Sequence, residues 1–172
     1  MLGSGIKVGP VPPREMFWSW LGSFLGIALV GHLHQSVMAP QDLVLIIGSF
    51  GASAVLIHGA IDSPLAQPRN LLGGHVISAV IGVTVFRLFG AEPWLAGALA
   101  VSLAIVAMQM TRTLHPPGGA TALIAVIGSE HIHAQGYFYA MIPAGLGALL
   151  MLLVALLVNN IPANRRYPKC WW

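Results

Sequence analysis

The chain has 172 residues, of which 56% are hydrophobic and 8% are charged, and its mean hydropathy is +0.80. A soluble globular domain needs more polar residues than this to cover its surface, so the composition excludes that class and indicates a membrane protein. The formal net charge of +3 is assigned to cytoplasmic loops of such a protein and not to a nucleic-acid surface. The single cysteine, Cys170, excludes an intrachain disulfide and a cysteine cluster for a metal.

Apolar segments long enough to cross a bilayer recur along the chain. A spanning helix needs roughly 20 apolar residues to cross about 30 Å of hydrocarbon, and such segments lie at 17–37, 71–89, 94–110 and 137–158. Two further segments, 43–61 and 117–128, are shorter or interrupted by small residues, and we expect short or broken helices there. The sequence thus predicts an all-α, polytopic transmembrane helix bundle. Its single domain covers residues 16–159, between cytoplasmic tails at 1–15 and 160–172.

The chain shows internal similarity at a spacing of 68 positions, where Gly51-Ala52-Ser53-Ala54 aligns with Gly119-Ala120-Thr121-Ala122. Each half, about 16–90 and about 91–159, then contains a long helix, a short helix that starts with glycine and a second long helix. This order is typical of transporters built from structural repeats. The alternative is that small residues recur in any membrane helix bundle.

The basic residues predict how these elements cross the membrane. If all six elements cross, Arg87 is the only basic residue on one side of the membrane. The other side carries the remaining basic residues, Lys7, Arg14, Arg69, Arg112, Arg165, Arg166 and Lys169. The positive-inside rule favours this arrangement, in which the two repeats are inverted and the short helices start near the midplane. In the alternative with four crossings, the short elements are re-entrant and the repeats are parallel. Both arrangements place both termini in the cytoplasm.

The starts of the two short helices are candidate binding sites for an anion. Backbone N–H groups at a helix start have no intrahelical partner, and the helix dipole adds about half a positive charge there. The first site contains Ser49, Phe50, Gly51 and Ser53. The second contains Pro117, Gly118, Gly119 and Thr121, and its prolines suit a helix start. The alternative is that both starts are capped internally and serve only packing.

Ionisable residues beside these helix starts are further candidates, because such residues are costly to keep in a membrane. His75 and His115 are predicted to contact the substrate, and an imidazole can accept or deliver a proton near neutral pH. Arg69, Asn70 and Arg112 are predicted to attract the anion or to gate its path. The alternatives are an interhelical hydrogen bond for His75, topology marking for the two arginines and a fixed connector for the loop that ends at Asn70.

Other patterns in the chain carry weaker signals. The pairs His32-x-His34 and His131-x-His133 are spaced for metal binding, but no cysteine accompanies them, so we expect no metal site and no cofactor. We also expect no enzyme, because the sequence has no paired carboxylate, nucleophile elbow, P-loop or Rossmann fingerprint.

Aromatic and small residues predict how the helices are placed. Aromatic residues at element ends are expected to anchor the protein at the bilayer boundary, namely Trp18, Trp20, Trp94, Tyr137 and Tyr139. Small residues at helical spacing, Gly22 with Gly26 and Gly74 with Ser78 and Gly82, are expected to let helices approach closely, within one protomer or between protomers.

Three ordered motifs connect the chain to a known family. They are Gly48-Ser49-Phe50-Gly51-Ala52-Ser53-Ala54, then Asp62-Ser63-Pro64-Leu65-Ala66-Gln67-Pro68-Arg69-Asn70 followed by Gly73-Gly74-His75, and finally His115-Pro116-Pro117-Gly118-Gly119-Ala120-Thr121-Ala122. On these motifs the chain resembles the HPP family of integral membrane proteins, from about Trp18 to Val158. The resemblance implies a compact multi-pass membrane protein, and similar members in plastids and cyanobacteria are nitrite transporters.

Together these features predict a transporter or channel for a small monovalent anion, with nitrite as the substrate that the resemblance implies. We expect it in the inner (plasma) membrane, in contact with the lipid bilayer, as a homo-oligomer and without a nucleic-acid partner. A non-transporting membrane scaffold or sensor is the alternative function. A cation or metal transporter, suggested by the paired histidines, is the third.

Overall fold

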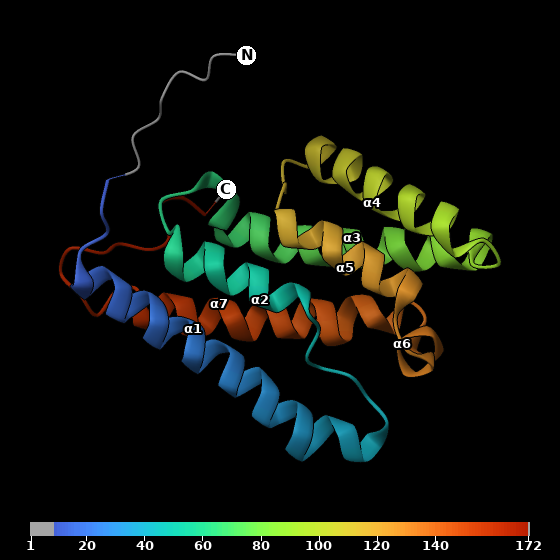
Figure 1. Cartoon of the computed structure of the whole chain (residues 1–172), viewed down its shortest axis with the longest axis horizontal. Coiled ribbons are helices and arrows are strands. Elements are labelled where there is room, and N and C mark those ends of the chain that lie inside the picture. Colours follow the sequence, from blue (N-terminus) through green and yellow to red (C-terminus); the bar gives the residue numbers. More distant parts are fainter. Residues whose placement is uncertain (1–8, 172) are drawn as a thin grey trace.

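The computed structural model describes residues 9–171, and the regular elements within that range are all helices (Figure 1). Four stretches there are long and apolar enough to cross a membrane. They are α1 (Pro13–Leu33) with its continuation to Gln41, α3 (Pro68–Phe89), α4 (Pro93–Met110), and α7 (Leu146–Val158) with the π-helical turn Ala140–Gly145 before it. The shorter helices are α2 (Ser49–Ala54) with the π-helical turn Val55–Gly59, α5 (Pro116–Ile127) and α6 (Glu130–Gln135). The predicted all-α membrane helix bundle is therefore confirmed.

Proline sets where most of these helices begin. Pro13, Pro68, Pro93 and Pro116 each start a helix, where the missing N–H is not needed and the fixed φ already suits the helix. The first helix therefore begins at Pro13, before the boundary at residue 16 that hydropathy predicts. Residues 1–8 of the predicted N-terminal tail, including Lys7, lie outside the described residues.

The first short segment becomes helical only at Ser49, although its apolar stretch begins at residue 43. Residues 43–47 are not helical and form a drawn-out connection in Figure 1, and the alternate side chains of Leu45 and Ile47 are buried. Period-two burial and β-branched residues favour an extended backbone. The N–H of Leu45 also donates to Nδ1 of His34 at 3.3 Å. This segment is thus half non-helical and half helical, as a broken helix requires.

Consecutive helices run in alternating directions (Figure 1). Helices α1, α3 and α5 run one way, and α2, α4 and α7 run the other way. The start of α1 and the end of α7 therefore lie at the same end of the bundle, on the left of Figure 1. Six crossings and inverted halves would produce this order of directions, although the duplication itself remains a prediction.

Small residues let neighbouring elements pack closely within one protomer. A Cβ at Gly82 of α3 would lie 2.6 Å from the carbonyl oxygen of Ala122 in α5, so the two backbones approach closely there. Gly22 of α1 likewise faces the ring of His58, and a side chain at position 22 would overlap it. These two small-residue faces, predicted from helical spacing, thus pack inside the protomer.

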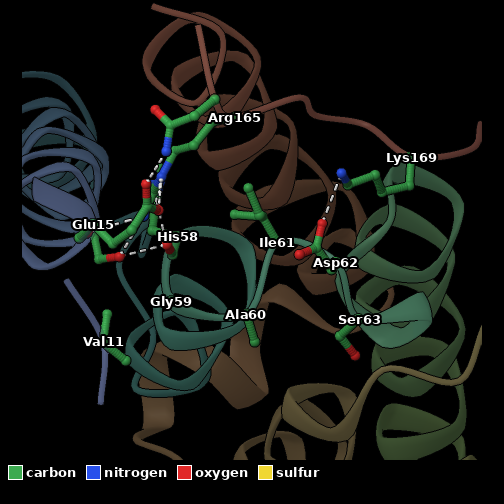
Figure 2. A pocket seen from close by; sticks show the side chains of 12 residues that line it. Val11, Glu15, His58, Gly59, Ala60, Ile61, Asp62, Ser63, Arg165 and Lys169 are labelled. Atoms are coloured by element: carbon green, nitrogen blue, oxygen red, sulfur yellow. Dashed lines mark hydrogen bonds and ion pairs between the residues drawn. The ribbon is translucent and has the colours of Figure 1, made fainter. Parts of the chain in front are cut away.

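Residues after α7 fold back over the end of the bundle where α1 begins. Arg165 is 7% exposed, and its Nε donates to Oε2 of Glu15 at 2.7 Å (Figure 2). A second ion pair joins Nζ of Lys169 to Oδ1 of Asp62 at 2.8 Å, and this pair is exposed. The two pairs lie on the wall of a cavity of about 440 Å³, so the C-terminal segment is fastened to the bundle.

Several basic residues gather at this same end. The Tyr167 hydroxyl donates to the carbonyl oxygen of Ala66 at 2.7 Å, which brings the C-terminal segment to the start of α3, and burial raises the pKa of this phenol. Arg69 follows Ala66 closely in sequence and therefore lies at the same end of the bundle as Arg165. Arg87 lies at the opposite end, with its guanidinium carbon 4.7 Å from the ring centre of Tyr137. This distribution agrees with six crossings, and the assignment of the basic end to the cytoplasm remains a prediction.

Candidate functional site

Two histidines meet at one serine in the centre of the bundle. Oγ of Ser53 lies 2.8 Å from Nε2 of His75 and 2.9 Å from Nε2 of His115. The three side chains are completely buried, and the two imidazole rings have centroids 5.2 Å apart. The structure therefore brings together residues of α2, of α3 and of the segment just before α5, which the sequence assigns to two separate helix starts.

Thr121 and Ser49 extend this group of polar side chains. Oγ1 of Thr121 lies 2.7 Å from Nδ1 of His75 and 2.9 Å from Oγ of Ser49. The Tyr139 hydroxyl donates to the backbone carbonyl oxygen of Thr121 at 3.0 Å. These side chains are also buried. We define the histidine–hydroxyl cluster as Ser49, Ser53, His75, His115 and Thr121.

His115 is held in place from two sides. Its Nδ1 lies 2.8 Å from the carbonyl oxygen of Leu65, in the turn before α3. Gly74 leaves room for it, because a Cβ at position 74 would lie 2.5 Å from the Cβ of His115. The following Pro116 disfavours helical backbone at His115, which is extended with φ −138° and ψ 106°. The helix break thus directs this imidazole toward Ser53.

The glycines predicted to bind substrate have different surroundings. Gly118 is buried, and a Cβ there would lie 2.7 Å from Oγ of Ser78 and 2.8 Å from the carbonyl oxygen of Gly74. Gly51 is exposed, with no atom within 4 Å of its Cβ position, and the nearest atom to that of Gly119 is 3.8 Å away. Gly118 therefore lies beside the cluster. Gly51 lies on the exposed face of α2 and the half-buried Gly119 faces Val101 of α4, so neither is brought to the cluster.

The residues predicted to attract or gate the anion lie at the rim of the bundle. Nη2 of Arg69 donates to the carbonyl oxygen of Thr111 at 2.6 Å, and Nδ2 of Asn70 donates to that of Leu114 at 2.8 Å. Both therefore fasten the connection between α4 and α5. Arg112 in that connection is exposed and left-handed, with φ 57°. Their role in attraction or gating remains a prediction.

Tyr139 contradicts its predicted role as an anchor at the bilayer boundary. It is completely buried, whereas Trp20 and Trp94 are 60% and 75% exposed. Position at an element end cannot distinguish these cases, because the exposure of Tyr139 depends on how the kinked start of α7 packs against α5. Phe50 of the first predicted helix start packs edge-on against His75, with ring centroids 5.2 Å apart.

The paired histidines outside the cluster have other contacts. Nε2 of His133 lies 3.1 Å from the carbonyl oxygen of Val126, and the ring stacks on Phe86. Nδ1 of His34 accepts the N–H of Leu45. Among residues 9–171, no group of three His, Cys, Asp or Glu side chains is placed to hold a metal ion.

The cluster offers hydroxyl and imidazole groups without a fixed charge. Its hydrogen-bond partners within the described part of the chain are one another, the Leu65 carbonyl oxygen and the Pro117 carbonyl oxygen, 3.3 Å from Oγ1 of Thr121. Hydroxyl and N–H groups can donate to anion oxygens. The cluster therefore offers an anion dipoles and hydrogen-bond donors but no fixed positive charge.

Comparison with known proteins agrees with a membrane location. Two proteins of Dictyostelium discoideum, each named as a transmembrane protein, are similar to this chain. One is 50% identical over 162 residues, covering 92% of this chain and 52% of the relative. The other is 49% identical over 177 residues, covering 99% of this chain and 61% of the relative. The chain thus spans less than two thirds of either relative, and no solved structure matches it.

The family comparison covers almost the whole chain. Residues 8–168 match the family described as HPP, transmembrane region. The match includes all the long helices and every residue of the histidine–hydroxyl cluster. This chain therefore belongs to the HPP family of transmembrane proteins.

Proposed function

We propose that this multi-pass membrane protein is a transporter or channel for a small monovalent anion, and that nitrite is its substrate. One observation carries the proposal. Ser49 and Ser53 of the first short helix meet Thr121 of the second in one buried polar cluster. Ser53 and Thr121 occupy matching positions in the two halves of the sequence, so each half would supply one hydroxyl to the same site.

The chemistry of the cluster suits a small anion with oxygen acceptors. Nitrite carries one negative charge on two oxygens, each of which accepts hydrogen bonds from hydroxyl or imidazole N–H groups. The start of α5 adds the positive end of a helix dipole beside His115, which immediately precedes the helix. Because no Lys or Arg contacts the cluster in the described part of the chain, the ion would be held weakly enough to leave.

The cluster is closed in this structure, since its polar groups bind one another and are buried. An entering anion would replace these hydrogen bonds with bonds to its own oxygens. We expect α2 to move during this exchange, because it is short, follows an extended segment and exposes Gly51 and Ala52 on its outer face. Transport would then alternate between a closed cluster and one opened by α2.

We place the protein in the inner (plasma) membrane with both termini in the cytoplasm. The support is the set of basic residues at the end where α1 begins and the C-terminal segment folds back.

We further propose a homo-oligomer. Outward-facing backbone at the start of a broken helix is poorly suited to lipid, which offers no hydrogen-bond partners, so a second copy would cover the outer faces of α2 and α5.

Flux into proteoliposomes tests the proposed function. Purified protein should take up nitrite faster than empty vesicles, in a saturable manner, with nitrate, formate and chloride as competitors. Selective uptake would identify the substrate among these anions. If correctly folded protein passes none of them, anion transport is excluded, and a scaffold or sensor that binds lipid or a protein partner becomes the better explanation.

A further inference from the structure

A continuous chain of hydrogen bonds runs through the histidine–hydroxyl cluster. It begins at the carbonyl oxygen of Leu65, 2.8 Å from Nδ1 of His115. Nε2 of His115 contacts Ser53 at 2.9 Å, and Ser53 contacts Nε2 of His75 at 2.8 Å. Nδ1 of His75 then contacts Thr121 at 2.7 Å, and Thr121 contacts Ser49 at 2.9 Å. Every link joins groups that can exchange a proton, apart from the carbonyl at the first end.

That carbonyl determines the direction of each hydrogen bond when the histidines are neutral. A carbonyl oxygen only accepts, so Nδ1 of His115 must carry a proton, and Nε2 of a neutral His115 must accept one. Ser53 therefore donates to His115 and accepts from Nε2–H of His75. Nδ1 of the neutral His75 is then an acceptor, and it receives the hydroxyl proton of Thr121, so Thr121 donates to Ser49 only after Nδ1 of His75 has gained a proton. The geometry thus assigns opposite tautomers to the two histidines.

One added proton reverses this chain without moving a heavy atom. A hydronium ion beside Ser49 gives it a proton, Ser49 passes its own proton to Thr121, and Thr121 passes its own proton to Nδ1 of His75. His75 passes its Nε2 proton to Ser53, and Ser53 passes its proton to Nε2 of His115. Each N–H or O–H bond that breaks is replaced by one that forms, and the net change is a single proton held as imidazolium on His115.

The cluster can hold only one such proton. A second would make both histidines cationic, with ring centroids 5.2 Å apart, and both Nε2–H groups would donate to Ser53. The groups that pack against the cluster are Phe50 of α2, which is edge-on to His75, and the Tyr139 hydroxyl, which donates to the backbone carbonyl of Thr121. Neither of these is charged, so no carboxylate among the described contacts would stabilise a second positive charge.

We propose that this series of hydrogen bonds is a proton relay that carries one proton together with each transported anion. The inference rests on the proposed anion transport and deepens it. An anion alone in this buried site would be an uncompensated charge, which is costly to desolvate. An anion beside a protonated His115 forms a neutral pair, so the relay makes the crossing electroneutral and couples nitrite to the proton gradient.

Nuclear magnetic resonance of the full chain tests the relay independently of transport. With ¹⁵N-labelled histidine in lipid nanodiscs, we expect His115 as the Nδ1–H tautomer and His75 as the Nε2–H tautomer at alkaline pH. The variants H75Q and H115Q assign the signals. On acidification, one proton should be shared by the pair. The same tautomer at both histidines, or two independent protonations, would overturn the relay.

Flux measurements test whether the relay couples the proton to the anion. A nitrite gradient should acidify the lumen of proteoliposomes by one proton per nitrite, after subtraction of empty vesicles, and uptake should not depend on membrane potential. Ser53→Ala should lower the ratio of protons to nitrite by at least about tenfold, since it removes the bridge between the imidazoles. Ser78→Ala is the matched control, because Ser78 is an equally buried serine that has no hydrogen-bond partner among residues 9–171, and it should keep the wild-type ratio.

The outcomes separate the two proposals. Nitrite uptake that is electrogenic and moves no proton would refute the relay as a coupling device while leaving anion transport in place. Absence of uptake for every anion would refute the proposed function, and the tautomers would then decide whether the proton-sharing pair exists. An equal change of the proton ratio in S53A and S78A would attribute the effect to packing and overturn the role of Ser53.

Discussion

Gly74 and His115 are in direct contact across the interface between α3 and the segment before α5, where a Cβ at position 74 would lie 2.5 Å from the Cβ of His115. Gly74→Ala should therefore push His115 away from Ser53 or separate the two elements. Overpacking of this kind costs about 1–3 kcal/mol. We expect a lower thermal unfolding midpoint in detergent and a lower nitrite flux.

Gly119→Ala is the control for this substitution. It also adds a methyl group at a glycine of the family motif, but the nearest atom to its Cβ position is 3.8 Å away. The unfolding midpoint of this variant should stay close to that of the wild type. If both variants unfold at the same lower temperature, close packing is not the reason that position 74 is glycine.

Thr121 should be required for flux because its hydroxyl contacts both His75 and Ser49. Thr121→Val keeps the shape of the side chain and removes the hydroxyl. Loss of one hydrogen bond that is made to the ion corresponds to about a tenfold lower flux. The measurement is nitrite uptake at equal protein content. Thr84→Val is the control, because it removes a hydroxyl from the exposed part of α3, and this variant should transport nitrite normally. Equal flux in T121V and the wild type would exclude Thr121 from the site.

The sequence was sufficient to predict most of the fold because membrane spans depend on local composition. Segments of about 20 apolar residues determine the long helices, while Pro68 and Pro93 start α3 and α4 and Pro116 starts the shorter α5. The hydropathy of residues 43–61 did not reveal that 43–47 are not helical, because periodicity barely separates a short buried strand from a buried helix. Nor did it predict α6, which is too short and polar to span a membrane.

The sequence pointed to individual residues of the candidate site but not to their arrangement in space. Ser49, Ser53, His75, His115 and Thr121 could be proposed individually, since each is a polar residue in or beside an apolar segment. Their meeting depends on α2 and α5 approaching α3 from different parts of the chain, which no local pattern encodes. Gly51 and Gly119 were also proposed for the site, but they lie outside the cluster. A glycine motif does not show which way its helix face points in the folded protein.

The ion pair between Arg165 and Glu15 should stabilise the protein, because the Arg165 side chain is only 4% exposed. It also contacts the hydroxyl of Ser19 at 2.8 Å, so Arg165→Leu leaves several groups without partners. Breaking a buried pair from one side costs about 3 kcal/mol. Thermal unfolding should show a clear loss of stability. In contrast, Lys169→Ala breaks the exposed pair with Asp62 and should lower the free energy of unfolding by about 0–1 kcal/mol. Equal losses of stability in both variants would contradict a special role for Arg165.

Cross-linking should detect the proposed contact between protomers at the outer face of α2. Val55 is an apolar side chain on this face and is 68% exposed. The one cysteine of the chain is Cys170, so Val55→Cys in a Cys170→Ser background places a single thiol there. Oxidation in lipid should then give disulfide-linked dimers. Leu88→Cys in the same background is the control, because Leu88 is 70% exposed near the end of α3, away from α2. Dimers from L88C as readily as from V55C would indicate random collision, and monomers from V55C would show that α2 faces lipid and not a second copy.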